Sequence, residues 1–385
     1  MESRWLRWVG PGVIALGALG SFATSTLGAG QRPWIPRPCS GGALDRTAAA
    51  GLPGPVALLD LGSQTWFRMD PMIDDAGTLQ GQQVSLGLDG VRAVRTMELP
   101  PESFTSGPFG RTVLIGSDDG SVSRLQAVDP SAGCAWALAE EGMVIRRATI
   151  DPAGEVVYEA RVDRVTRADL GVWSRPLDGV GPARSVLPPL DPDDRFGRTF
   201  STEFAWALDG RGLAVQSCGE VACRTRIIGF DGRPDRELAE PDLGLLAGFD
   251  GDRMVTYAAC RGLPCPIVAT DLTTGVRQIL SADAGLAVVV ATSDGPRLVH
   301  EAADAAGLRL RSVALDGQSA SDLGPLPDGF RLQATPDRAG SATRLPLDWI
   351  LLSPDGRLPL EAAALRPRLR HFPDGATVQL DEVTR

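Results

Sequence analysis

Aspartate and glycine pairs recur along this sequence, and each is followed by a short apolar run. The most regular copies begin at Leu208-Asp209-Gly210, Phe249-Asp250-Gly251 and Ser293-Asp294-Gly295. In each copy a second apolar run follows, and then a second turn. The second turn comes roughly 22 to 24 residues after the first turn, which is the length of one hairpin. Asp-Gly readily adopts the positive φ of tight hairpin turns, and β-branched residues suit partly buried strands. The pattern therefore predicts short antiparallel strands.

Looser copies extend the repeat in both directions, at intervals of about 50 residues, which leaves room for four short strands per unit. One four-stranded sheet cannot bury both of its faces, whereas a ring of about four to eight such sheets can. We therefore predict an all-β fold, a β-propeller of seven four-stranded blades, with six blades as the alternative. A β-sandwich with long loops, or two small β domains, are the competing interpretations. The first turns of the units are marked by Gly54, Gly110, Gly154, Gly210, Gly251, Gly295 and Gly356.

Glycine and proline are frequent enough to exclude long helices. The chain has 45 glycines and 30 prolines, and beyond residue 31 the longest stretch without either runs from Glu155 to Leu170. At 43% hydrophobic residues, the body is too apolar for a disordered chain. Composition thus agrees with a turn-rich globular β domain.

Three strings in the repeats resemble those of TolB-type propellers. They are Ser-Pro-Asp-Gly-Arg-Leu at 353–358, Asp-Pro-Ala-Gly-Glu-Val-Val at 151–157 and Trp-Ser-Arg-Pro-Leu-Asp-Gly at 173–179. The resemblance spans roughly residues 51–385 at turns and inner strands. It implies the fold only, since such families include protein-binding platforms and peptidase accessory domains.

The N-terminus has the pattern of an export segment. Arg4 and Arg7 precede an apolar core from Val13 to Phe22, and small residues follow. A cleaved signal places the body outside the cytoplasm, and so does the alternative, an uncleaved membrane anchor over residues 8–30. The expected organisation is a signal or anchor over residues 1–30, a linker over 31–50 and the propeller over 51–385.

Charge and residue usage exclude several classes of function. All 38 basic residues are arginine, and lysine and asparagine are absent, so the chain has no lysine Schiff base and no GxxxxGK phosphate loop. Two histidines cannot build a three-histidine metal site. The net charge of −10 argues against nucleic-acid binding. We expect no cofactor and no resident metal.

Six cysteines in an exported chain predict three disulfides. Cys218 with Cys223 and Cys260 with Cys265 form two C-x4-C pairs at equivalent hairpin tips of consecutive units. By elimination, Cys39 pairs with Cys134 and ties the N-terminal tail to a blade edge. The alternative for the two C-x4-C pairs is a four-cysteine zinc site.

The two histidines carry no catalytic pattern. Strand alternation sends His300 and Glu301 to opposite sheet faces, so we expect His300 to be packed within a blade rather than paired with that acid. His371 precedes a Pro-Asp-Gly turn and is expected to be exposed. The sequence has no GxSxG nucleophile elbow.

Acidic, aromatic and basic clusters have structural interpretations. The acidic pairs Asp74-Asp75 and Asp118-Asp119 and the run from Asp191 to Asp194 are expected in solvated loops, the last with calcium binding as the alternative. The strip from Arg366 to His371 is expected at an exposed strand edge, with an anionic partner as the alternative. Equivalent positions predict packing between blades for two first-strand tryptophans, Trp206 and Trp349, and two third-strand tryptophans, Trp66 and Trp173.

Taken together, these patterns predict an exported or surface-tethered propeller that acts as a binding or scaffold module for a protein or a cell-envelope glycan. Loops clustered on the two faces of a propeller can recognise a partner without any catalytic group. The alternative is a propeller hydrolase or lyase with carboxylates around the central channel. We assign no catalytic residue from the sequence.

Overall fold

The computed structural model is all β in the part of the chain that it describes. That part comprises residues 35–39, 66–76, 78–87, 95–109, 112–129, 132–190, 198–199, 201–219, 223–238, 244–258, 264–292, 295–305, 307–325, 365–371 and 377–383. These residues contain strands, turns and bends, and no helix. None of them belongs to a helix that has the length and apolar character to cross a bilayer.

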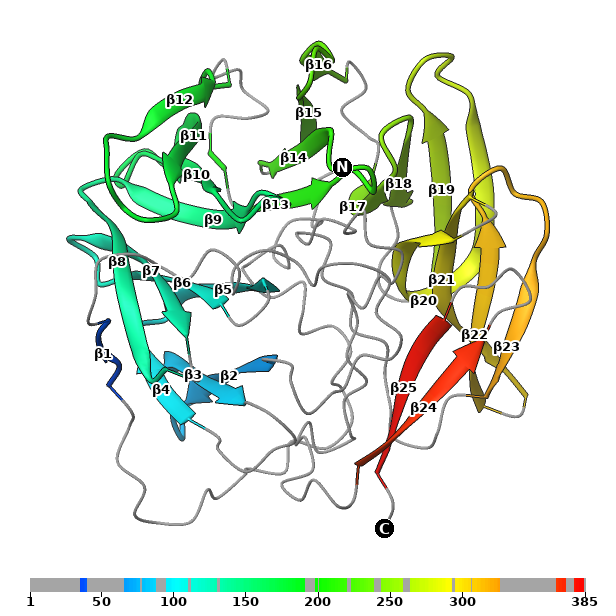
Figure 1. Ribbon diagram of the computed structural model, residues 1–385, viewed down its shortest axis with the longest axis horizontal. Coiled ribbons are helices and arrows are strands. Elements are labelled where there is room, and N and C mark those ends of the chain that lie inside the picture. The colour runs from blue at the N-terminus through cyan, green and yellow to red at the C-terminus, as the bar shows by residue number, and fades with distance from the viewer. Residues whose placement is uncertain are drawn as a thin grey trace.

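Three sheets contain four consecutive antiparallel strands each (Figure 1). The first has β5 (Glu102–Phe109), β6 (Thr112–Asp118), β7 (Ser123–Asp129) and β8 (Cys134–Glu141), with the short β1 (Arg37–Pro38) parallel to β8 at its outer edge. The second has β9 (Val144–Ile150), β10 (Val156–Val162), β11 (Asp169–Pro176) and β12 (Arg184–Leu187). The third has β13 (Ser201–Trp206), β14 (Gly212–Cys218), β15 (Cys223–Gly229) and β16 (Arg236–Glu237). They confirm the expected four-stranded unit.

A fourth sheet joins two such units through one long strand. It runs in order through β17 (Leu245–Phe249), β18 (Arg253–Tyr257), β19 (Cys265–Asp271), β20 (Arg277–Thr292), β21 (Gly295–Asp304), β22 (Gly307–Ala314) and β23 (Ser321–Pro325). Ala284 of β20 pairs both with Cys265 of β19 and with Ala302 of β21. Strand β20 is therefore the last strand of one unit and the first of the next.

Two smaller sheets flank these units in the sequence. One comprises β2 (Trp66–Ile73), β3 (Leu79–Gly87) and β4 (Arg95–Leu99), and the other comprises β24 (Leu365–His371) and β25 (Thr377–Val383). Figure 1 shows the sheets following one another around the molecule in sequence order. The number of blades stays a prediction.

The first strands of successive units lie next to one another. Strand β2 contacts β5, β5 contacts β9, β9 contacts β13, β13 contacts β17, and β17 contacts β20. Ala207 and Phe249, which directly follow β13 and end β17, form a parallel bridge. Parallel first strands arranged side by side around an axis, each opening a sheet that extends outward, define a β-propeller, and the predicted fold class is confirmed.

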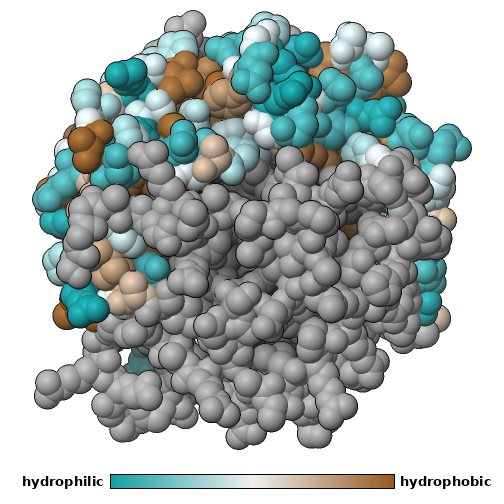
Figure 2. Space-filling view, viewed as in Figure 1, coloured by the Kyte–Doolittle hydropathy of each residue, from teal (hydrophilic) through white to brown (hydrophobic). Residues whose placement is uncertain are grey.

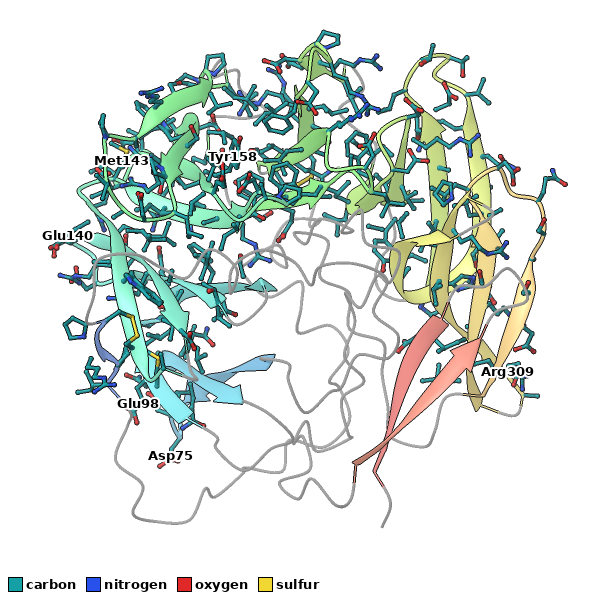
Figure 3. The ribbon with its side chains drawn as sticks, viewed as in Figure 1. Asp75, Glu98, Glu140, Met143, Tyr158 and Arg309 are labelled. Carbon is teal, nitrogen blue, oxygen red and sulfur yellow. A yellow bond between two sulfur atoms is a disulfide. The ribbon has the colours of Figure 1, made fainter. Side chains whose placement is uncertain are left out.

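Hydrophobic residues fill the spaces between adjacent sheets. Between the second and third sheets, Tyr158 packs edge-on against Trp206 and Phe230, with ring centroids 5.6 and 5.7 Å away (Figure 3). Trp206 also donates a hydrogen bond from Nε1 to Thr149 Oγ1 over 3.1 Å. The second sheet thus buries one face against the first sheet and the other against the third, which explains why an isolated unit would not be stable.

Trp173 lies in β11, the third strand of its sheet, as expected. Trp66 begins β2, the first described strand of its sheet, and its assignment to a third strand stays a prediction. The expected strand before residue 66, and with it the unit that starts at Gly54, lies outside the described residues, as do Gly356, Trp349 and the N-terminal segment 1–30. In the predicted linker, residues 35–39 include β1 and the disulfide-bonded Cys39.

Candidate functional site

The two ends of the strands carry different connections. At one end, here called the turn face, lie tight turns with positive-φ glycines, such as Gly154, Gly210 and Gly251, where φ is 72°, 72° and 108°. At the other end, here called the loop face, lie the hairpin tips between second and third strands and the connections between units, because antiparallel strands alternate in direction. Binding residues are commonly carried by loops that a rigid scaffold positions, which makes the loop face the candidate site.

The loop between β10 and β11 is held rigidly at the loop face. Arg164 donates to both carboxylate oxygens of Asp118, over 2.6 and 2.9 Å, and from Nε to the backbone oxygen of Gly142 over 2.8 Å. Asp163 closes the loop by accepting hydrogen bonds from the backbone nitrogens of Val165 and Thr166. The Thr166 hydrogen bonds hold the pKa of Asp163 below its usual value. Arg164 and Asp118 therefore clamp two neighbouring units together.

This loop presents Arg167 to the start of β5. Arg167 donates from Nη2 to the carboxylate oxygens of Glu102, over 2.9 and 3.2 Å. Its backbone has φ 62°, a left-handed conformation that costs a non-glycine residue about 1–2 kcal/mol. The hydrogen bond from Thr199 N to the Arg167 carbonyl holds it there. Such stored strain is a feature of ligand-binding segments.

A β-bulge adds a second arginine to the same carboxylate. Ala160 of β10 pairs with Arg147, and Arg161 pairs with Ile145, so Arg146 is an extra residue in β9. A bulge redirects side chains that would otherwise alternate between faces. Arg146 Nη1 lies 3.7 Å from Glu102 Oε2, and Arg147 donates to Thr105 O of β5 over 3.2 Å. Consecutive arginines thus both reach β5.

Arg147 also extends the charged region to the next inner strand. Its Nη2 lies 3.4 Å from Oε2 of Glu203 in β13. Charged side chains from β5, β9 and β13, together with the β10–β11 loop, therefore converge near the loop face. We call Arg146, Arg167 and Glu102 the arginine site.

Positive charge is in excess at the arginine site. Burial lowers the pKa of the Arg146 guanidinium, and repulsion from Arg167 lowers it further, whereas Glu102 and Asp118 act in the opposite direction. Arginine nevertheless remains protonated. Arg146 Nε and Arg167 Nη1 are buried donors that have no hydrogen-bond partner. Such groups call for an explanation, for instance an ion or a ligand.

A second charged cluster, deeper in the same interface, is balanced and fully bonded. Glu159 of β10 is completely buried and bonds to Arg161 and Arg175, and both arginines also reach Glu141 Oε1, over 3.1 and 2.9 Å. Arg175 donates to Leu138 O over 2.7 Å. Two cations and two anions joined by direct hydrogen bonds form a structural network between β8, β10 and β11.

His300 is placed as expected from the sequence. It lies in β21 with 3% of its surface exposed, and Nδ1 donates to the Glu301 backbone oxygen over 2.9 Å. Burial lowers its pKa. His371 ends β24 opposite Thr377, at a hairpin end.

Asp74 and Asp119 have local roles in turns, whereas the solvated position expected for Asp118 was wrong, because it is buried at the end of β6 and bonds to Arg164. Asp74 accepts hydrogen bonds from the backbone nitrogens of Ala76 and Thr78, and Asp119 accepts them from Ser121 and Val122. The run from Asp191 to Asp194 lies outside the described residues. Among residues whose positions the structure gives, no group of three or more histidine, cysteine or acidic side chains could hold a metal ion. The strip from Arg366 to His371 forms most of β24.

The structure contains two of the predicted cysteine pairs. Cys39 is bonded to Cys134 beside β1, and Cys218 is bonded to Cys223 across the β14–β15 tip on the loop face. Cys265 is disulfide-bonded as well, and its expected partner Cys260 lies outside the described residues.

The arginine site was missed by the sequence analysis. Glu102, Arg146 and Arg167 stand in unrelated segments, and Glu102 and Arg167 are 65 residues apart. The adjacent Arg146-Arg147 pair in an otherwise apolar strand was the one local signal.

Comparisons with known proteins found similar folds. No protein-family model matches the sequence, and no curated protein matches it. Similar solved structures include TolB from Acinetobacter baumannii, with 13% identity and a TM-score of 0.40 over 68% of this chain and 64% of that one. A structure from a study of two prolyl endopeptidases has 15% identity and a TM-score of 0.48, over 83% and 53% of the two chains. The β-propeller domain of the Trilobed protease from Pyrococcus furiosus has 11% identity and a TM-score of 0.43, over 76% and 90%.

The chain spans less than two thirds of the length of the first two of these proteins. The likeness concerns the β-propeller fold, and TolB proteins are among the propellers to which the chain is similar.

Proposed function

We propose that this chain is an exported or surface-tethered β-propeller that binds a protein or a cell-envelope glycan through its loop face. The observation that supports the proposal is the convergence of Glu102, Arg146 and Arg167 from two inner strands and a clamped loop, with excess positive charge and unbonded donors. Hydrophilic and hydrophobic residues are interspersed over the described part of the face shown in Figure 2. Recognition through polar and charged contacts fits the two arginines and the carboxylate of the arginine site.

Export is supported by the disulfides, since such bonds persist in oxidising compartments. We place the body outside the cytoplasm, either secreted or held at the cell surface through residues 8–30. Mass spectrometry of the protein recovered from cells tests this proposal. Cleavage after the apolar segment supports secretion, an intact N-terminus in the membrane fraction supports an anchor, and recovery in the cytoplasm contradicts both.

The enzyme alternative stays a prediction. It requires carboxylates that converge on a reacting group with perturbed pKa values. Glu102 and Glu203 are inner-strand carboxylates, and each contacts an arginine.

Photo-crosslinking tests the binding function. A photoreactive residue replaces Val165, which is 89% exposed on the loop face, and in a matched control it replaces Val276, which is 64% exposed in a turn at the other face. In cells that produce the protein, we expect a saturable cross-linked product from position 165 and little from 276. Equal products from both positions, or none from position 165, would contradict recognition by the loop face.

A further inference from the structure

We propose that the arginine site binds a carboxylate of an acidic peptide segment carried by a partner protein. This inference rests on the proposed binding function and names the chemistry of its ligand. Neither the sequence repeat nor the fold assigns such a site.

The guanidinium groups of the site have unused donors. Arg146 Nη1 lies 3.7 Å from Glu102, which is beyond hydrogen-bond distance, and Arg146 Nε has no partner. Arg167 uses Nη2 for Glu102, while its Nη1 has no partner. Guanidinium groups match carboxylates in a bidentate geometry, which makes a carboxylate the ligand that fits these donors.

Charge counting leads to the same ligand. Arg164 and Asp118 neutralise each other through two hydrogen bonds. Glu102 is shared by Arg146 and Arg167, so two guanidinium groups face one carboxylate in these ion pairs. A second carboxylate would give each guanidinium group its own partner. The two unbonded nitrogens are buried, whereas 43% of the Glu102 side chain is exposed, so an incoming carboxylate reaches them by replacing Glu102.

The site is organised before a ligand arrives. The Arg164 clamp fixes the loop that carries Arg167, and the bulge fixes Arg146 in β9. Preorganised donors avoid the entropy cost of ordering flexible arginines on binding.

The neighbouring surface favours a peptide as the source of the carboxylate. Val165 is exposed in the same loop, two residues before Arg167. An apolar contact beside paired cations suits a segment in which acidic and apolar side chains are neighbours. An oligouronate carries the same carboxylate without the apolar side chains, and it serves as the competing ligand in the test.

Fluorescence anisotropy with the purified full-length chain tests the proposal. The probes are a labelled Glu-Leu-Glu-Glu-Leu-Glu hexapeptide, the same peptide with glutamine in place of glutamate, and labelled hexagalacturonate. We expect saturable binding of the acidic peptide that weakens as salt is added. The double variant R146Q/R167Q should lose at least about tenfold in affinity. Arg211→Gln, an exposed arginine at the turn face, is the matched control and should bind like the unaltered chain.

Glu102→Gln gives a prediction of opposite sign. It keeps the size of the side chain and removes the competing charge, so affinity for the acidic peptide should rise by about threefold or more. This variant decides the matter if R146Q/R167Q does not fold, as judged by near-ultraviolet circular dichroism.

Three results would overturn the inference: no binding of the acidic peptide, unchanged affinity in folded R146Q/R167Q or in Glu102→Gln, or tighter binding of hexagalacturonate than of the peptide. A saturable cross-link from position 165 together with any of these results would support the proposed binding function and contradict the carboxylate site. If neither the cross-link from position 165 nor binding of the acidic peptide is observed, the proposed function and the carboxylate site are both contradicted.

Discussion

Arg175 of β11 donates two hydrogen bonds to the fully buried carboxylate of Glu159 in β10, over 3.1 and 2.8 Å. The pair faces β8 of the preceding unit, where Arg175 also bonds to the backbone oxygen of Leu138. It therefore links strands within one sheet and, at the same time, two adjacent sheets. Burial makes this pair far more sensitive to substitution than an ion pair at the surface.

Glu159→Ala should be strongly destabilising. It leaves Arg161 and Arg175 buried with only Glu141 between them, and breaking a buried ion pair costs about 3–5 kcal/mol. The free energy of unfolding in urea measures the loss. Arg309→Ala, which removes an exposed pair with Asp322, is the control and should change stability little.

A combined replacement separates charge from packing at the same place. E159L/R161M/R175M removes the three buried charges and leaves Glu141, whose side chain is 26% exposed, so it should be less destabilising than Glu159→Ala. A loss for Glu159→Ala no greater than that for Arg309→Ala would contradict the structural role of this network.

The two tyrosines should resist ionisation in the folded protein. Burial raises the pKa of Tyr158 to about 12, and burial raises the pKa of Tyr257 as well. The neutral phenols are favoured by folding, so their contribution to stability is complete below about pH 10 and is lost as the pH rises through the folded pKa values.

Absorbance at the tyrosinate band measures this effect. Since the chain has two tyrosines, the native protein should show almost no tyrosinate signal at about pH 10, where the protein unfolded in guanidinium is half ionised. Tyr158→Phe should remove half of the signal of the unfolded protein. A native titration midpoint near pH 10 would be incompatible with the burial of these two phenols.

Gly171→Ala should destabilise the protein more than Gly275→Ala. Both glycines have positive φ, 83° and 72°, which alone costs alanine about 1–2 kcal/mol. A Cβ at Gly171 would also lie 2.2 Å from the backbone oxygen of Leu187, whereas nothing lies within 4 Å of one at Gly275. Urea unfolding of the two variants isolates the effect of the clash, and equal losses would count against the close approach of β11 to the end of β12.

Removing the Cys39–Cys134 disulfide should cost more than removing Cys218–Cys223. The bonded cysteines are 95 and 5 residues apart, and the chain-entropy model gives about 4.7 kcal/mol for a loop near 100 residues and about 2 kcal/mol for one this short. Double alanine variants of each pair, compared by urea unfolding, test the difference. If the short pair proved the more costly to remove, its tip would have a role beyond loop closure.

Local features of this fold were predictable from the sequence. The runs after Gly154 and Gly210 form β10 and β14, and both glycines have a φ of 72°. Turn chemistry and strand propensity act over a few residues, so the printed sequence contains that information. The burial of Trp206 between sheets was predictable for a related reason, because repeated units place similar environments at equivalent positions.

The position of a strand within its sheet was harder to predict. The run that starts at Trp66 shows an alternation that suits a first strand as well as a third, and only the tertiary structure pairs it with β3 and places it against β5. Period and hydrophobicity are alike in both positions, whereas pairing partners lie far apart in the chain.

Repeated short antiparallel strands follow from the sequence alone, because aspartate-glycine turns and β-branched runs are specified over a few neighbouring residues. Long-range packing, in contrast, makes Arg146 and Arg167 share Glu102 and buries Glu159 between two arginines. These contacts depend on one extra residue in β9 and on how closely neighbouring sheets pack around the axis. Both are settled by long-range packing, which brings together side chains that no local pattern connects.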